Sequence, residues 1–427
     1  MGKKKATLGQ RIKKLGKSLF IWGPLDYNLF FTIIFLNVYG IIMVYSASYN
    51  NTLTKNANYF MMNQLKNVIF GLVVMLIASY INYHYVVRFM WGWFWLVIAA
   101  GVILALKTPL AHSELGATRW INLGPISFQA AEPVKAAVII FYAFYVRYIG
   151  LDTWRKQFLA VSIAMLLLAS LFVFSNNLST VVVLFGICAV IVTSSVKKPD
   201  IYLYAIAALV LFIIVAFVVI IYLVIHKGSA ENFRFVRIRA WLNPEEYAAD
   251  EGLQAMQARY AIGAGGFWGK GLGQSLIKFK LSYSYNDFIL AIICEELGVF
   301  GVIVMMSLFG YLLYRIYKIA IGAWDIDGKV LAIGVFTQIA LQLLINVMVV
   351  TSLIPTTGVT LPFFSAGGTS VVFLLAELGL VFNVEKYARE RRIKEEAERY
   401  VEQLEQRGGI GSAGWRRRLD SLKAHKK

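Results

Sequence analysis

Several charged and amide side chains interrupt the apolar stretches of this chain, and their types are those of groups that accept protons or bind anions. They are Glu132 with Lys135, Asp287, Glu295 with Glu296, Gln338 with Gln342 and Asn346, and Glu377. Where such a stretch crosses a membrane, an ionised side chain near the bilayer centre costs at least about 2.5–3.5 kcal/mol. Each of these residues therefore needs a partner or a function.

Asp287 stands out because it opens an apolar run soon after a segment rich in glycine, IGAGGFWGKGLGQS (262–275). An acid near Lys270, Lys278 and Lys280 is the arrangement expected of a proton-transfer site beside an anion-binding surface. The glycines form no nucleotide motif, since Lys270 is followed by glycine and no strand is expected before them. We expect them to permit tight turns and close backbone approach.

The other polar residues have structural explanations as well. Glu132 would lie in the first turn of a helix, where it complements the helix dipole and can pair with Lys135 three residues later. The amides at 338, 342 and 346 recur every four residues, and such a stripe favours hydrogen bonds between helices over ligand contact. Glu295 and Glu296 would face a polar interior.

The composition indicates a membrane protein. Of 427 residues, 59% are hydrophobic and only 15% are charged, too few to cover the surfaces of soluble domains of this total length. Cys188 and Cys294 lie in separate apolar runs, so we expect two free buried thiols. Four scattered histidines lack the spacing of zinc ligands, which argues against a metal-centred enzyme.

The net charge of +18 is concentrated in two tails. Residues 1–25 carry seven basic and no acidic side chains, and residues 384–427 carry 13 basic and eight acidic ones. Basic tails that flank membrane spans mark the cytoplasmic side more often than nucleic-acid binding, so we expect no nucleic-acid partner. The first apolar run begins near Tyr27 and is long enough to be an anchor, so no cleavable signal peptide is expected.

Apolar stretches of about 20 residues predict ten transmembrane helices in an all-α polytopic membrane protein. The expected spans are 27–47, 66–86, 89–107, 131–147, 158–175, 180–195, 201–225, 286–314, 328–351 and 368–384. An even count and the basic loops place both tails in the cytoplasm and the large 226–285 loop outside the cell. The expected parts are a basic tail (1–25), a membrane domain (26–386) and a charged helix with a basic tail (387–427).

Four ordered segments resemble the SEDS family of bacterial cell-wall synthesis, which includes FtsW, RodA and SpoVE. They are GATRWINLGPISFQAAEPVKAA (116–137), the stretch from Arg234 through LNPEE (242–246) to GLQAMQARYAIGAGGFWGKGLGQS (252–275), NDFILAIICEELG (286–298) and PTTGVTLPFFSAGGTS (355–370). The resemblance extends over most of residues 27–386. SNNLST (175–180) is more similar to the FtsW and SpoVE branch than to RodA.

The resemblance implies a peptidoglycan glycosyltransferase that polymerises lipid II at the outer face of the bacterial cytoplasmic membrane, during division and at the septum. Its implied partners are lipid II, the growing lipid-linked glycan, a class B penicillin-binding transpeptidase and other division proteins. The family's essential acid corresponds to Asp287. The implied substrate-binding residues are Glu132, Lys135, Arg119, Gln129, Gln254, Lys270, Lys278 and Ser365.

The chain departs from the family pattern at neighbours of these residues. Gln-Pro-Ser-Glu is replaced by Gln129-Ala130-Ala131-Glu132, Ser-Tyr-Gly-Gly by Ser365-Ala366-Gly367-Gly368, and Thr-Asp-Phe by Asn286-Asp287-Phe288. These replacements remove hydroxyl groups and one aromatic ring. The acid and the lysine are therefore the most secure members of the expected site.

The expected chemistry joins two lipid-linked disaccharides with inversion and release of undecaprenyl diphosphate. A carboxylate acting as general base on the attacking hydroxyl contributes on the order of 10²–10⁴-fold, and Asp287 is the expected base. Fixed cations such as Lys135 and Arg119 would stabilise the departing diphosphate. The sequence requires no cofactor and shows no metal ligands, although a divalent cation, Mg²⁺ or Mn²⁺, could assist.

Three other functions remain open at this point. Ten spans with embedded acids and amides also suit a lipid II flippase, although no inverted repeat is evident. A RodA-type elongation polymerase would share the same chemistry. A non-catalytic scaffold for a penicillin-binding partner would use the polar residues for packing alone.

Overall fold

The computed structural model describes residues 21, 23–48, 57–89, 92–114, 117–123, 126–175, 178–196, 233–246, 251–279, 286–365 and 368–406. Four parts of the chain lie wholly or mostly outside the described residues. They are the predicted span 201–225, the basic tail 1–25, the segments of the outer loop (226–285) that are missing from the ranges above, and the C-terminal tail beyond 406.

The described part of the chain is mostly helical, and helices lie at nine of the ten predicted spans. They are α2 (Tyr27–Ser48), α3 (Ala57–Tyr80), α5 (Trp93–Ala105), α6 (Ala131–Phe144), α7 (Trp154–Ser175), α8 (Leu178–Ser195), α12 (Ile289–Ile321), α13 (Ile326–Val350) and α14 (Thr369–Gln406). By length and composition five of these, α2, α3, α7, α12 and α13, can cross a membrane, and α5 and α8 are shorter apolar helices. The predicted helical membrane fold is confirmed.

Large apolar side chains cover the outer faces of these helices, as lipid contact requires. Phe70 on α3 is 61% exposed, Leu166 on α7 is 71% exposed and Ile303 on α12 is 51% exposed. A water-soluble protein would bury most such side chains, whereas lipid tails are as apolar as these residues are. The exposed belt therefore supports the prediction of a multi-pass membrane protein.

The second span begins and ends earlier than its hydropathy predicts. Helix α3 begins at Ala57 rather than near 66, because its first turns carry amides that lower the hydropathy while Gln64 is buried. It ends at Tyr80, and a short helix, α4 (Tyr83–Arg88), begins after Asn82, whose side chain accepts a hydrogen bond from the backbone N–H of His84. Asn82 is thus the N-cap of α4, which separates α4 from the end of α3.

A three-stranded antiparallel sheet, which the all-helical prediction lacks, precedes α6. Its strands β1 (Ala111–Glu114), β2 (Ala117–Leu123) and β3 (Ile126–Gln129) pair in the order β1-β2-β3. Trp120 pairs with Gln129 across β2 and β3. Because β3 runs almost directly into α6, the sheet sets the position of the residues at the head of that helix.

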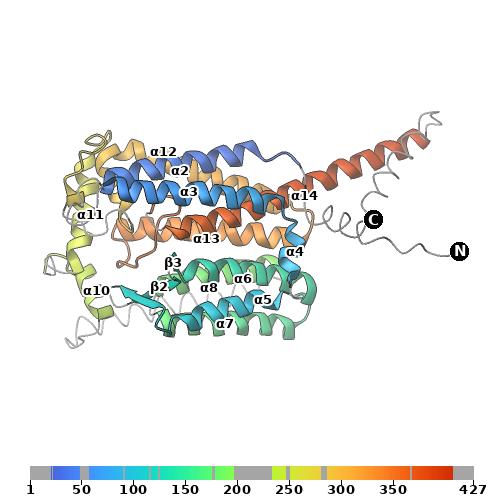
Figure 1. The fold of residues 1–427 in the computed structure, drawn as a ribbon, viewed down its shortest axis with the longest axis horizontal. Coiled ribbons are helices and arrows are strands. Elements are labelled where there is room, and N and C mark those ends of the chain that lie inside the picture. The colour runs from blue at the N-terminus through green and yellow to red at the C-terminus, as the bar shows by residue number, and fades with distance from the viewer. Residues whose placement is uncertain are drawn as a thin grey trace.

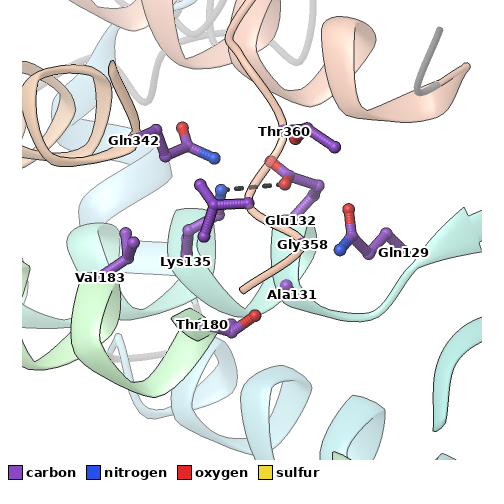
Figure 2. A pocket seen from close by; sticks show the side chains of 10 residues that line it. Gln129, Ala131, Glu132, Lys135, Thr180, Val183, Gln342, Gly358 and Thr360 are labelled. Carbon is purple, nitrogen blue, oxygen red and sulfur yellow. Dashed lines mark hydrogen bonds and ion pairs between the residues drawn. The ribbon is translucent and has the colours of Figure 1, made fainter. Parts of the chain in front are cut away.

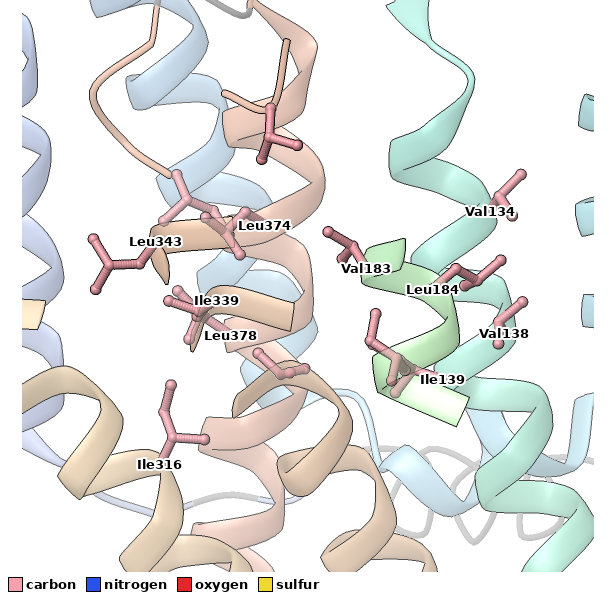
Figure 3. Close-up of a cluster of buried hydrophobic side chains, with 14 of the residues drawn as sticks. Val134, Val138, Ile139, Val183, Leu184, Ile316, Ile339, Leu343, Leu374 and Leu378 are labelled. Atoms are coloured by element: carbon pink, nitrogen blue, oxygen red, sulfur yellow. The ribbon is translucent and has the colours of Figure 1, made fainter. Parts of the chain in front are cut away.

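Helix α13 forms the centre of the bundle. It packs against α6, α8, α12 and α14, and apolar side chains of these helices fill the space between them (Figure 3). At one end of the bundle lie the sheet and the helices α10 (Phe233–Leu242) and α11 (Glu251–Gly265), and at the other lie α4 and the far part of α14 (Figure 1). The first is called the sheet end here and the second the α4 end.

Helix α14 continues without a break through the segment that the sequence divides into a span and a separate charged helix. It runs from Thr369 to Gln406, and in its charged part Arg399 lies 3.4 Å from Glu395, four residues earlier. Both cysteines are free, with Cys188 buried and Cys294 half-buried.

Candidate functional site

A buried ion pair lies in the first turns of α6, at the sheet end. Lys135 Nζ donates to Glu132 Oε1 at 2.9 Å, and the two side chains are 2% and 5% exposed. The spacing of three residues places both groups on one face of the helix, as the sequence predicts. Both groups line a pocket, so the pair is buried within the protein and still adjoins open space.

Four other parts of the chain complete this pocket (Figure 2). Gln129 comes from the end of β3, Thr180 from α8, Gln342 from α13 and Thr360 from the loop between α13 and α14. The lining is mainly polar, with one carboxylate, one ammonium group, two amides and two hydroxyls. Such a set suits a ligand that carries both hydroxyls and negative charge.

A second hollow adjoins the first on the other side of Glu132. Both are lined by Glu132, Gln342 and Thr360, and the second extends to Ser365 and to Ser370 at the start of α14. Glu132 therefore lines both hollows, one of which also has Lys135 in its lining and the other the hydroxyls of Ser365 and Ser370. The sequence prediction brings Glu132, Lys135, Gln129 and Ser365 together, and the structure places all four here.

Asp287 lies in the turn before α12 and is partly exposed. The Nδ2 group of Asn346 donates to the carbonyl oxygens of Asp287 and Val359, each at 2.9 Å, and Val359 lines the pocket. The hydroxyl of Ser365 donates to the carbonyl of Asn286 at 3.0 Å. Two hydrogen-bonding side chains thus fix the Asp287 turn against the loop that forms the pocket wall.

The polar stripe of α13 has two uses. Gln338 donates to Glu377 on α14 at 2.8 Å, and Asn346 makes the bonds just described, so the prediction of hydrogen bonds between elements is confirmed for these two. Gln342, between them, lines both hollows instead. Among the described residues, Glu377 Oε1 and Gln338 Oε1 have no hydrogen-bond donor. One carboxylate oxygen of Glu377 is therefore satisfied by Gln338 and the other is not.

The glycine-rich segment is bound to a break in α12. Backbone N–H groups of Lys270 and Gly271 donate to the carbonyls of Glu295 and Glu296, both at 2.9 Å. Gly298 interrupts α12 with a φ of 66°. Gly269 has a φ of 77° and packs directly against the backbone of Glu296, so that an added Cβ would lie 2.2 Å from the carbonyl oxygen of Glu296. The prediction that glycine permits close backbone approach is confirmed here.

The lysines of this segment pair with the two buried acids of α12. Lys270 Nζ lies 2.7 Å from Glu295 Oε1. Lys278 is 1% exposed, lies 3.6 Å from Glu296 Oε1, and donates to the carbonyl of Gly273 at 2.7 Å. The structure therefore places the ammonium groups of both lysines on acids of α12, and neither residue lines the pocket around Glu132.

Two further expected binding residues come from α11 and β2. Gln254 is half-buried on α11, and Arg119 lies on β2 with its side chain outside the described part of the structure. The sequence reasoning missed Thr180 and Thr360 as pocket residues. Thr180 ends the SNNLST segment and Thr360 lies in PTTGVTLPFF, so both are in recognised motifs, but only the fold brings these motifs to one pocket.

Within the described residues, metal-ligand geometry occurs away from this pocket. His84, Asp325 and Asp327 offer ligand atoms within 4.8 Å of one another at the α4 end. A divalent cation at the pocket would have Glu132 as its nearest lining carboxylate, and this group is paired with Lys135.

The sequence matches known proteins over most of its length. The family described as "Cell cycle protein" (FtsW/RodA/SpoVE) matches residues 27–390. Similar relatives include "Probable peptidoglycan glycosyltransferase FtsW" of Trichlorobacter lovleyi, 33% identical over 84% of this chain and 92% of its own length. From Bacillus subtilis come a protein of the same name, 32% identical over 90% and 95%, and stage V sporulation protein E, 33% identical over 84% and 96%.

Solved structures share the fold. A chain of a peptidoglycan synthase complex that coordinates polymerization and crosslinking superposes with a TM-score of 0.69 at 21% identity, over 86% of this chain and 99% of that one. The rod shape determining protein RodA of Thermus thermophilus gives 0.60 at 20% identity, over 86% and 98%. Identities this low support the architecture alone, and the sequence matches carry the classification. The chain belongs to the FtsW/RodA/SpoVE family of cell cycle proteins.

Proposed function

We propose that this chain is a peptidoglycan glycosyltransferase that polymerises lipid II, with Asp287 as general base. The names of two relatives, each a probable peptidoglycan glycosyltransferase FtsW, support the activity. The observation that carries the site is the hydrogen bonding of Asn346, which ties the Asp287 turn to the wall of the pocket that holds Glu132 and Lys135. The turn that carries the acid is thereby tied to the loop that lines the pocket of the buried cation.

The two groups have complementary tasks in glycosyl transfer. A sugar hydroxyl is a poor nucleophile at neutral pH, and a carboxylate that takes its proton contributes on the order of 10²–10⁴-fold. The departing diphosphate gathers negative charge, which Lys135 stabilises from a site largely removed from water. Glu132 holds the ammonium group in place, and Gln129 and Gln342 can donate hydrogen bonds to sugar and phosphate oxygens. The hydroxyl of Ser365 donates to Asn286, so it can only accept a hydrogen bond from a sugar hydroxyl.

Lys270 and Lys278 have a different part in this proposal. Their ammonium groups pair with Glu295 and Glu296, so they fix the glycine-rich segment to α12 near Asp287. Lys270 remains 32% exposed and can still attract an anionic substrate, whereas Lys278 is buried. We assign Lys278 to positioning the segment.

The orientation of the site follows from the charges of the loops. Arg88 is the last residue of α4, Arg147 follows the end of α6, and Arg155 and Lys156 are in the first turn of α7. All four lie at the α4 end, which the positive-inside rule assigns to the cytoplasm. The sheet end, with the pocket and Asp287, then faces outward. Lipid II would reach it laterally from the outer leaflet, because its lipid tails cannot leave the membrane.

Partners and cellular role follow from the same relatives. A solved neighbour is part of a peptidoglycan synthase complex, which supports a class B penicillin-binding transpeptidase as the partner that crosslinks the new glycan. The FtsW and stage V sporulation relatives favour action at a division septum over elongation of the side wall.

Purified protein in lipid vesicles with labelled lipid II tests the proposal. Asp287→Asn should reduce glycan synthesis at least about 100-fold, because the amide cannot accept the proton. Asp152→Asn is the matched control, because Asp152 is an exposed carboxylate at the α4 end, and it should keep full activity. Retained synthesis in Asp287→Asn would refute the assignment, and movement of lipid II across the bilayer without glycan would indicate a flippase.

A further inference from the structure

A histidine and two aspartates meet at the α4 end, the end of the bundle opposite the sheet (Figure 1). His84 is in the first turn of α4, Asp325 caps α13, and Asp327 is in the first turn of α13. His84 Nε2 lies 2.7 Å from Asp325 Oδ2 and 3.7 Å from Asp327 Oδ2. Two helices distant in sequence thus bring three metal-ligating side chains together, for which glycosyl transfer has no use.

The hydrogen bonds of His84 determine which of its nitrogens carries the proton. Nδ1 lies 2.8 Å from Asn82 Oδ1, and that same oxygen accepts the backbone N–H of His84, which identifies it as the carbonyl oxygen of the amide. Nδ1 must therefore be the donor. In the neutral ring Nε2 then carries a lone pair, and this lone pair faces two carboxylates that also only accept.

Asp327 has the same need for a positive partner. Its side chain is fully buried, and among the described residues neither carboxylate oxygen has a hydrogen-bond donor. The nearest cation, Arg147 Nη1, is 4.0 Å from Oδ1, and the Arg147 side chain is 42% exposed. A buried carboxylate without a donor is unfavourable, and metal coordination is one of the ways proteins compensate for it.

Asp325 turns one carboxylate oxygen towards His84 and uses the other for hydrogen bonds of its own. Oδ1 accepts hydrogen bonds from the Tyr83 hydroxyl at 2.6 Å and from the Gly328 N–H at 3.1 Å, so Oδ2 is the oxygen turned towards His84. In the neutral ring, Oδ2 and the lone pair of His84 Nε2 therefore face one another at 2.7 Å with no proton between them.

We propose that His84 Nε2 and the carboxylates of Asp325 and Asp327 bind a divalent cation such as Mn²⁺ or Zn²⁺. One nitrogen and two carboxylates suit these ions, and the two negative charges balance the charge of the ion. The surroundings resemble those of other metal-binding histidines, since Nδ1 donates to an oxygen and thereby orients the ring. The proposal does not depend on the proposed glycosyltransferase activity.

The geometry needs only a small adjustment. Ligands about 2.1 Å from a tetrahedral ion lie about 3.4 Å from each other, so His84 Nε2 and Asp325 Oδ2 must separate by less than about 1 Å. The His84 ring stacks on Tyr83 with centroids 4.1 Å apart and lies 4.7 Å from the ring of Tyr387 on α14. With 23% of its side chain exposed, His84 leaves the ion a path from the solvent at this end.

The bound ion would join three parts of the bundle. It links α4, and through it the end of α3, to the start of α13, and Tyr387 brings in α14. Because α13 is the central helix, an ion here would limit movements of its α4 end relative to its neighbours. We therefore expect metal binding to be visible as added thermal stability.

Full-length protein in detergent, stripped with a chelator, tests the site with Mn²⁺ as the probe. The wild-type protein should bind Mn²⁺, and electron spin-echo spectroscopy of the bound ion should show a signal from a directly bonded imidazole nitrogen. Binding should also raise the thermal unfolding midpoint by a few degrees. His84→Gln should lose the nitrogen signal and bind at least tenfold more weakly. Asp327→Asn should also bind at least tenfold more weakly, and its metal-free midpoint should rise because a buried charge is removed.

The controls separate this site from other cation binding. Asp152→Asn removes an exposed carboxylate at the same end and should leave the signal, affinity and midpoint shift unchanged. If Asp327→Asn fails to fold, His84→Gln alone provides the test. This variant should fold because the replaced His84 side chain is partly exposed. The proposal is overturned if wild type shows no imidazole signal, or if His84→Gln keeps it. It is also overturned if the cluster responds only to pH, as a protonated His84 paired with Asp325 would.

Discussion

In the described part of the chain, three buried carboxylates at the sheet end pair with lysines, and two of these pairs differ in how fully the hydrogen-bonding groups of the acid are used. In the first, Glu132 pairs with Lys135 at 2.9 Å. In the second, Glu295 pairs with Lys270 at 2.7 Å. Residue type, burial of the carboxylate and ion-pair distance are nearly the same, although Lys270 is 32% exposed and Lys135 only 2%. None of the three shared properties distinguishes a binding site from a structural one.

The remaining contacts do distinguish them. Besides Lys270, Glu295 accepts from the Ser275 hydroxyl and from the backbone N–H groups of Leu276 and Ile277 at 3.2 and 3.3 Å. Lys135 is the donor the structure gives Glu132, and the pair adjoins two hollows. A carboxylate whose oxygens all accept hydrogen bonds, such as Glu295, holds the surrounding backbone in place. A carboxylate beside a cavity that can accept further hydrogen bonds, such as Glu132, can still bind a ligand.

Lys135→Met gives the largest effect expected from this comparison. Removing one preorganised cation from the site of a developing charge costs on the order of 10²–10³-fold in rate, so glycan synthesis from labelled lipid II should fall by that amount. The variant should also unfold more easily, since breaking a buried ion pair leaves Glu132 unpaired and costs about 3–5 kcal/mol.

The double variant Glu132→Gln with Lys135→Met separates the two effects. Neutralising both partners removes the unpaired charge, so the unfolding midpoint should return towards wild type while synthesis stays low. Recovery of synthesis together with stability would show that the pair of Glu132 and Lys135 acts only in packing. Spare acceptor capacity would then not distinguish Glu132 from Glu295.

Glu295→Gln should show the opposite pattern. Loss of a charge-assisted network costs roughly 1–3 kcal/mol, which should lower the unfolding midpoint because the glycine-rich segment is held less firmly to α12. The rate of synthesis per folded molecule should change less than about tenfold, since the pocket residues are untouched. A 100-fold loss of rate at an unchanged midpoint would move Glu295 into the substrate site.

Hydropathy predicts the nine spans that the structure describes, because lipid exposure demands long apolar runs, but it predicts none of the shorter helices α4, α10 and α11. It placed the start of α3 about nine residues late, since buried amides such as Gln64 read as loop. The sheet before α6 went unpredicted although ATRWINL and ISFQ are rich in β-branched and aromatic residues. These strands are too short to compete with the helical pattern of the surrounding chain.

The candidate site was predictable only in part for a physical reason. Glu132 and Lys135 are neighbours on one helix, so their spacing alone predicted the pair. The link from Asp287 to the pocket depends on Asn346, 59 residues away, and on the fold of the loop around Val359. Likewise, four histidines without ligand spacing gave no sign that His84 meets Asp325, because 241 residues separate them.

Lys156→Gln should have the smallest effect and thereby shows what exposure does to an ion pair. Lys156 lies 2.7 Å from Asp152, closer than Lys135 is to Glu132, but the two side chains are 39% and 57% exposed. Water solvates both charges whether or not they pair, so exposed i,i+4 pairs are worth only about 0.3–0.5 kcal/mol. The unfolding midpoint should therefore move by no more than about 1 °C. A drop comparable to that of Lys135→Met would mean that distance rather than burial sets the value of these pairs, and it would also disqualify Asp152→Asn as a neutral control.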